Sequence, residues 1–193
     1  MDERRLIVLS GPSGCGKDTI LRRLKELDPA IKANISFTTR EPRPGEADGV
    51  NYHFVTKEQF LDNIDKGIML EYNEYAGNYY GTSREAIEKQ IEDGYTVVLT
   101  IDVNGGRNVK KNYPGAMLLF LMPPSISELR RRLFTRGDVD PESMKARLRI
   151  AEDEIFYAQH YDRVIINREV DECAGECLEA INAWKTAPAG SEA

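Results

Sequence analysis

Short aliphatic runs recur along the chain and are separated by stretches with helical periodicity. The runs are apolar throughout, which is typical of strands that are buried on both faces of a sheet. Their alternation with helices predicts an α/β fold in which a parallel sheet is flanked by helices. The clearest runs are residues 6–9, 96–101, 117–121 and 163–166.

Several hydroxyl residues are followed three positions later by a carboxylate or an amide, and these pairs predict helix starts. In such a pair the hydroxyl accepts a backbone N–H, and the second side chain reaches back to the first residue. A proline in the first helical turn is a further start signal, because its fixed φ suits the helix. The predicted starts are Thr56 with Gln59, Thr82 with Glu85, Ser125 with Glu128, and Asp140 with Pro141.

Two stretches are poor core material and divide the chain. Residues from about 34 to 81 are rich in Gly, Pro, Tyr and polar side chains, which suits an inserted binding lobe. Residues from about 125 to 149 are crowded with arginines and are expected to form a lid. We therefore expect one domain over residues 1–185, with a core of 1–33, 82–124 and 150–185, and a disordered tail over 186–193.

The charge balance limits the choice of partners. The 193 residues include 26 basic and 32 acidic side chains, and the net charge of −6 argues against binding to nucleic acid or to an anionic membrane surface. No run approaches the roughly 18 apolar residues of a membrane span. Three cysteines are too few for a disulfide scaffold, so we expect free thiols and a cytoplasmic location.

The strongest motif is a glycine-rich loop between the first apolar run and a helical pattern over residues 19–27. It reads Gly11-Pro12-Ser13-Gly14-Cys15-Gly16-Lys17. In a phosphate-binding loop of this kind, backbone N–H groups surround phosphate oxygens and the lysine neutralises the β and γ phosphates of a nucleoside triphosphate. The alternative is an ordinary glycine-rich turn, which this context disfavours. Within the loop, Cys15 is expected to be a small filler rather than a nucleophile.

Asp18 departs from the usual loop motif, in which Ser or Thr follows the lysine and holds Mg²⁺. A carboxylate can itself bind Mg²⁺ through a hard oxygen. An acid in the first turn of a helix is equally well explained by the helix dipole. Both interpretations stand, and Asp18 and Thr19 are assigned with the loop to the nucleotide site.

A second group of motifs resembles guanylate kinases and narrows the substrate. The run 36–46, Ser-Phe-Thr-Thr-Arg-Glu-Pro-Arg-Pro-Gly-Glu, with Gly49 and Tyr52, is similar to the GMP-binding segment of that family. Further matches are Glu71, the runs 77–82 and 101–105, and the pairs 136–137 and 147–148. They follow the family order over nearly the whole chain. The resemblance implies an ATP:GMP phosphotransferase that uses Mg²⁺ and has no obligate protein partner.

The resemblance also implies the roles of individual residues in the acceptor site. The residues that would bind the GMP phosphate are Arg40, Arg43, Tyr52 and Tyr80, and those at the guanine would be Ser36, Glu71 and Thr82, with Asp102 also in the substrate site. Guanine offers two adjacent N–H donors, and one carboxylate can accept both, whereas adenine lacks this pair. Each residue alone could be a solvated charge or a half-buried aromatic; their joint occurrence in order favours binding.

The arginine-rich segment supplies the remaining catalytic candidates. By the resemblance, Arg136 and Arg147 reach across the transferring phosphoryl group and act with Lys17 and Arg40. Planar guanidinium groups suit this role because they bind phosphate oxygens in pairs. No general base is expected, because a phosphate monoester with a second pKa near 6 is mostly dianionic at pH 7.

Two positions at strand ends remain open. Guanylate kinases usually carry Asp at both positions 100 and 102, but this chain has Thr100, so one carboxylate is missing. Asn167 follows a predicted strand, where it would either contact adenine or simply form a turn.

Two rival functions are a kinase for another phosphate acceptor and an inactive interaction module. Glu71 argues against the first, and the intact phosphate loop argues against the second.

Overall fold

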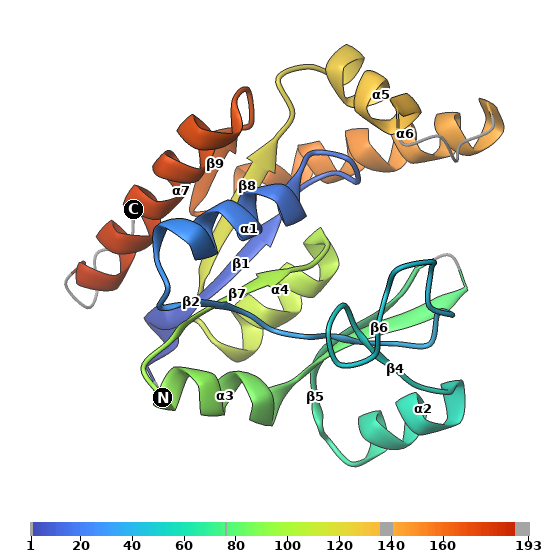
Figure 1. The fold of residues 1–193 in the computed structure, drawn as a ribbon, viewed down its shortest axis with the longest axis vertical. Helices are drawn as coiled ribbons and strands as arrows, with labels where there is room; N and C mark the ends of the chain where they lie inside the picture. Colours follow the sequence, from blue (N-terminus) through green and yellow to red (C-terminus); the bar gives the residue numbers. More distant parts are fainter. Residues whose placement is uncertain (1, 76, 136–140, 188–193) are drawn as a thin grey trace.

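The computed structural model describes residues 2–75, 77–135 and 141–187, which form two sheets and their flanking helices (Figure 1). The larger sheet is parallel, with five strands in the order β2-β7-β1-β8-β9. Its strands are β1 (Leu6–Ser10), β2 (Ile31–Ala33), β7 (Thr96–Thr100), β8 (Met117–Met122) and β9 (Arg163–Ile166). The predicted α/β class is confirmed, although β7 ends one residue before the predicted strand and β8 continues one residue beyond it.

The described residues contain the helices α1 (Lys17–Leu27), α2 (Lys57–Asp65), α3 (Arg84–Glu92), α4 (Val103–Asn112), α5 (Ile126–Thr135), α6 (Pro141–Phe156) and α7 (Val170–Thr186). Four of them, α1, α3, α4 and α7, cover the two faces of the parallel sheet. On one face α1 and α7 bury an apolar cluster that includes Ile20 and Ile181. On the other face α3 and α4 bury a second cluster that includes Ile87 and Val109. The parallel strands β1 and β8 are thereby buried between two helical layers.

Strand β9 does not match the predicted burial on both faces. Only Ile165 is buried, whereas Val164 and Ile166 are 45% and 39% exposed. The reason is its position: β9 pairs with β8 alone and forms one edge of the sheet. An apolar run in the sequence does not distinguish a central strand from an edge strand.

A second sheet of four strands, in the order β4-β3-β6-β5, lies beside the parallel sheet. Its strands are β3 (Phe37–Thr38), β4 (His53–Phe54), β5 (Met69–Tyr75) and β6 (Asn78–Ser83). β5 and β6 form an antiparallel hairpin, and β3 pairs with β6. Helix α2 places Phe60 in full burial beneath this sheet, with its ring 5.5 Å from that of Tyr79. Contacts between β5 and α4 join the two sheets.

The predicted helix starts have different outcomes. Thr56 forms the full capping box with Gln59 at the start of α2, and the Ser125 hydroxyl accepts the N–H of Glu128 before α5. The start at Thr82 is wrong, because Thr82 is still in β6 and Ser83 caps α3 instead. Thr and Ser are similarly good N-cap residues, so the sequence alone does not tell which of Thr82 and Ser83 begins the helix. The hydroxyl of Thr82 donates instead to the carboxylate of Glu71, which holds Thr82 in the strand. Helix α6 begins at Pro141, and the predicted cap Asp140 lies outside the described residues.

Helices α5 and α6 pack on each other above the phosphate loop. Leu129, Leu133 and Met144 form their own small apolar cluster with Ala151. After α6, a 3₁₀ turn (Tyr157–His160) leads into β9. Helix α7 includes Thr186, and residues 188–193 of the predicted tail lie outside the described part.

The described residues show three further features that bear on composition. Cys15, Cys173 and Cys177 are buried free thiols, as expected. None of the described helices is long and apolar enough to cross a membrane. The single tryptophan, Trp184 on α7, donates its indole N–H to the carbonyl of Gly115 at 3.1 Å. Gly115 precedes β8, whereas the phosphate loop follows the parallel strand β1, so the two lie at opposite ends of the sheet.

Candidate active site

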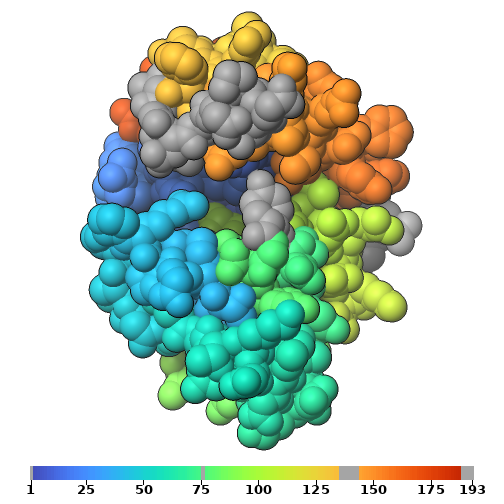
Figure 2. All heavy atoms as spheres, turned by 90° about the vertical axis from the view of Figure 1, so that its right-hand side faces the viewer, coloured from blue at the N-terminus to red at the C-terminus, as the bar shows by residue number. Residues whose placement is uncertain are grey.

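A cavity of about 900 Å³ lies where the parallel strands end, between the second sheet and α6. The molecule is visibly hollowed at this place (Figure 2). The carboxyl ends of β1 and β7 contribute to its wall, which is the usual position of a ligand site in an open parallel sheet. Of the predicted nucleotide residues, those that line it are Gly11, Ser13, Lys17 and Asp18.

Residues 11–16 form the loop between β1 and α1, and its geometry depends on glycine. Gly11, Gly14 and Gly16 have φ values of 147°, 88° and 100°. A Cβ atom on Gly11 would lie 2.3 Å from the backbone oxygen of Leu121. Only glycine adopts this conformation at so close an approach. The glycines therefore let the loop pack closely against its neighbours, and Gly11 and Ser13 line the cavity.

Asn167 and Arg132 hold the loop from behind. Asn167 is buried, with 4% of its surface exposed, and its side-chain amide donates to the carbonyl of Cys15 at 2.8 Å. Arg132 donates to the same carbonyl at 3.3 Å and to the carbonyl of Asn167 at 3.1 Å. These contacts support the backbone of the phosphate loop, a role for Asn167 that sequence reasoning missed because a buried amide has no distinct sequence signal.

Lys17 is folded back onto its own loop. Its ammonium group donates to the carbonyl of Pro12 at 3.2 Å and also to the carbonyl of Gly11. The neighbouring Cys15 is fully buried, and this burial raises the pKa of its thiol. A protonated buried thiol is a poor nucleophile, in agreement with its interpretation as a filler.

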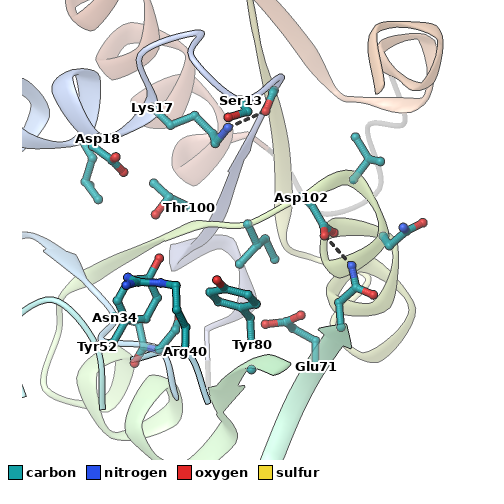
Figure 3. A pocket seen from close by; sticks show the side chains of 18 of the residues that line it. Ser13, Lys17, Asp18, Asn34, Arg40, Tyr52, Glu71, Tyr80, Thr100 and Asp102 are labelled. Atoms are coloured by element: carbon teal, nitrogen blue, oxygen red, sulfur yellow. Dashed lines mark hydrogen bonds between the residues drawn. The ribbon is translucent and has the colours of Figure 1, made fainter. Parts of the chain in front are cut away.

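Arg40, Tyr52 and Tyr80 lie across the cavity from Lys17 and Asp18 (Figure 3). The register of β3, β4 and β6 brings them together, since Thr38 pairs with both Phe54 and Tyr80. The Arg40 guanidinium lies 5.6 Å from the centre of the Tyr52 ring, and the two tyrosine rings meet edge to face at 6.0 Å. Arg43 also lines the cavity, so all four predicted phosphate ligands are among its lining residues.

Glu71 is a buried carboxylate on the cavity wall, only 6% exposed. The hydroxyl of Thr82 donates to it at 2.6 Å, and the hydroxyl of Ser36 lies 3.5 Å from that of Thr82. Burial raises the pKa of Glu71 to about 7, although the Thr82 hydrogen bond opposes the shift; the charge of Asp102 adds to it. Thr82 itself is fully buried and reaches the cavity through Glu71.

Asp102 connects α4 to the second sheet. One carboxylate oxygen caps α4 by accepting the N–H of Gly105 at 2.8 Å, and the other accepts the side-chain amide of Asn73 at 2.5 Å. Asn73 lines the cavity and was missed at the sequence level. Its signal was available in principle, because it follows Glu71 by two positions on β5 and therefore shares its face.

The remaining predicted residues come from both ends of the site. Thr100 lines the cavity at the end of β7, with Asp18 in the first turn of α1 (Figure 3). Arg147 lines it from α6, whereas Arg136 lies outside the described residues. Glu154, also on α6, was not predicted; burial raises its pKa to about 7, with the charge of Lys17 opposing the shift.

Comparisons with known proteins agree with this arrangement. The family model described as "Guanylate kinase" matches residues 3–184. A guanylate kinase of Thermobifida fusca is 45% identical over 95% of this chain and 93% of its own, and one of Clostridium perfringens is 44% identical over 91% and 81%. The crystal structure of guanylate kinase from Anaplasma phagocytophilum superposes with a TM-score of 0.79 at 33% identity, covering 94% of this chain and 86% of that one. The chain therefore belongs to the guanylate kinase family.

Proposed function

We propose that the protein transfers the γ-phosphoryl group of ATP to GMP or dGMP, and so serves guanine nucleotide synthesis and recycling. The observation that carries the proposal is one cavity in which a phosphate loop faces both a cationic wall and a buried carboxylate. The relatives named guanylate kinase support it. The buried free cysteines fit a cytoplasmic setting, because a reducing compartment keeps thiols free.

In the acceptor site, Glu71 would accept the two adjacent N–H donors of guanine. Thr82 would act through Glu71, since its hydroxyl fixes one carboxylate oxygen at 2.6 Å. Ser36 lies on the cavity wall beside this pair and would complete the base site. Adenine lacks the paired donors and would leave the buried carboxylate without partners, which is costly. The phosphate of GMP would then lie at the wall formed by Arg40, Tyr52 and Tyr80 with Arg43.

In the donor site, the phosphates of ATP would bind the backbone of the loop at the N-terminus of α1. Lys17 would exchange its contacts with loop carbonyls for phosphate oxygens. Arg147 would approach the transferring group from α6, together with Arg136 by family resemblance. Catalysis would rest on positioning and charge neutralisation rather than on a base, because the GMP phosphate is already a nucleophile.

Mg²⁺ is the metal that the family implies, and the donor set fits it. Asp18 is an exposed carboxylate at the cavity, and Thr100 offers a hydroxyl on the same cavity wall. Mg²⁺ takes one or two carboxylates beside waters and phosphate oxygens. When bound, it neutralises charge on the β- and γ-phosphates. Asp18 would hold it directly or through water.

The test is a coupled ADP-release assay over a panel of GMP, dGMP, AMP, CMP and UMP. We expect GMP to be used at least about a hundredfold better than AMP, because AMP leaves Glu71 unpaired. Glu71→Ala should reduce this preference strongly by removing the acceptor for both guanine donors. Equal rates on GMP and AMP would refute the assignment of the base site. ADP release that none of the five nucleotides stimulates would be hydrolysis of ATP by water and would contradict their role as acceptors, and no turnover at all would favour an interaction module or a kinase for another phosphate acceptor.

A further inference from the structure

Arg40 and Glu46 form an ion pair in the wall of the cavity. One Arg40 nitrogen, Nη2, lies 3.0 and 2.9 Å from the two carboxylate oxygens of Glu46. The two side chains are only 15% and 18% exposed, unlike the solvated pairs at a protein surface that contribute little. The Arg40 guanidinium also lies over the rings of Tyr52 and Phe54, at 5.6 and 5.8 Å from their centres.

The same carboxylate is attached to the second arginine of the segment. Glu46 Oε2 accepts the backbone N–H of Arg43 at 2.8 Å, and the backbone N–H of Glu46 donates to the carbonyl of Arg43 at 3.0 Å. The Arg43 backbone hydrogen bond holds the pKa of Glu46 below its usual value, with a further contribution from Arg40. Glu46 is therefore a fixed anion that contacts both Arg40 and Arg43, the two arginines at which the GMP phosphate is proposed to bind.

We propose that Glu46 is a positioning residue for the acceptor phosphate: it fixes the plane of the Arg40 guanidinium so that the remaining donors of Arg40 meet the phosphate of GMP. This inference rests on the proposed function, which places the GMP phosphate at Arg40. A guanidinium has five N–H donors. Glu46 takes the Nη2 side and the carbonyl of Glu41 takes one donor of Nη1 at 2.7 Å, which leaves donors for a ligand.

The physical gain is orientation before binding. An unrestrained arginine loses much rotamer freedom when it binds a ligand, and this cost weakens the complex. With Glu46 and the two rings in place, the guanidinium is ordered before GMP arrives. The affinity of the site for the GMP phosphate should therefore depend on Glu46, although Glu46 would not contact the phosphate and is negatively charged like it.

The opposite arrangement is that Glu46 competes with phosphate for Arg40. A carboxylate and a phosphate use the same paired geometry on a guanidinium. The backbone N–H of Arg43 also holds the Glu46 carboxylate, so a phosphate that displaced Glu46 from Arg40 could not move it out of the cavity wall. This second attachment therefore argues against competition. The two arrangements predict opposite signs, since loss of a competitor strengthens GMP binding and loss of a positioning residue weakens it.

The experiment is calorimetric binding of GMP and of guanosine to the wild type, Glu46→Ala, Glu46→Gln and the control Glu41→Gln. Glu41 is an exposed acid of the same segment whose contact with Arg40 uses only its backbone, so the control keeps that contact. We expect Glu46→Ala to raise the GMP dissociation constant about tenfold or more, with guanosine changed less than about twofold. Glu46→Gln keeps the shape and should show a smaller loss, so it carries the test if Glu46→Ala fails to fold.

Arg40 provides the second half of the test. If Glu46 acts through Arg40, Arg40→Ala should weaken GMP binding much less in the Glu46→Ala background than in the wild type. Tighter GMP binding by Glu46→Ala, equal losses for GMP and guanosine, or additive effects of the two substitutions would each overturn the inference. A wild type that does not bind GMP would refute the proposed function as well, whereas an unchanged GMP constant in Glu46→Ala refutes the inference alone.

Discussion

The buried carboxylate of Glu71 makes guanine binding sensitive to pH. Its pKa is raised to about 7, mainly by burial, and only the ionised form can accept both guanine donors. Below pH 7 the ionised fraction falls by about fivefold to tenfold per pH unit. We expect the dissociation constant of guanosine to rise accordingly between pH 8 and pH 6, measured by direct calorimetric titration at each pH. Guanosine is the ligand of choice because it lacks the phosphate group, which itself titrates near pH 6.

The control for this prediction is Glu71→Gln, whose guanosine affinity should be weaker and independent of pH.

The raised pKa of Glu71 also affects the stability of the protein without ligand. An acid whose pKa is raised on folding stabilises fully below its ordinary pKa near 4.5, and this contribution is lost as pH rises through 7. Glu71→Gln should therefore gain on the order of 3 kcal/mol of unfolding free energy relative to wild type between pH 4 and pH 8. A constant difference across this range in urea titrations would contradict the assigned burial effect.

Asp18 and Thr100 invite a test of charge exchange at the metal site. Relative to the family pattern, Asp18 adds a carboxylate beside the phosphates and Thr100 removes one at the end of β7. Both side chains line the same cavity. If they compensate, Asp18→Ser should raise the Mg²⁺ concentration needed for half-maximal rate, and adding Thr100→Asp should restore it. Mg²⁺ titrations of initial rate for the wild type, both single variants and the double variant decide the matter. An unchanged Mg²⁺ dependence in Asp18→Ser would mean that Asp18 is only a first-turn acid.

At the scale of elements, two helical glycines allow a matched comparison. Gly175 on α7 has open space where a Cβ would lie, whereas a Cβ on Gly105 of α4 would lie 2.8 Å from a carboxylate oxygen of Glu71. Gly175→Ala should stabilise its helix by about 0.5–1 kcal/mol and leave activity unchanged. Gly105→Ala should displace Glu71, because a side-chain end moves more easily than a backbone, and raise KM for GMP about tenfold with KM for ATP unchanged. Thermal melts and steady-state kinetics of both variants test this contrast; equal kinetics would show that Glu71 has room to move.

The elements differ in how far the sequence determines them. The strands β1, β7 and β8 and the start of α2 follow from local apolar runs and a local capping box, and these were predicted. The two-residue strands β3 and β4 have no such local signal, because their pairing comes from the hairpin and loop around them. Likewise the contacts of Asn73, Gly105 and Glu154 depend on packing between distant segments. Family motifs pointed to residues that line the cavity, such as Arg40, Glu71 and Arg147, but not to the contacts among them.

For the whole molecule, the arrangement of the site predicts closure. The phosphate loop and the wall that carries Arg40, Tyr52 and Tyr80 face each other across a cavity of about 900 Å³. Water must be kept from ATP during phosphoryl transfer, so the two sides are expected to close over the substrates. We expect a ligand that joins ATP and GMP to reduce the radius of gyration measured by X-ray scattering, as the second sheet and α6 approach each other. ATP alone should produce a smaller change. A radius that is unchanged at saturation would contradict the prediction.

The position of the lone tryptophan gives this molecule an optical property. Trp184 is fixed to Gly115 on the far side of the core, and it is absent from the cavity wall. Its fluorescence emission therefore reports whether the packing between α7 and the parallel sheet is intact. We expect the same signal to change little when ligands bind, because Trp184 does not line the cavity. Unfolding of the core and occupation of the cavity can then be followed independently in one sample, with a dye on the second sheet as the reporter for occupation.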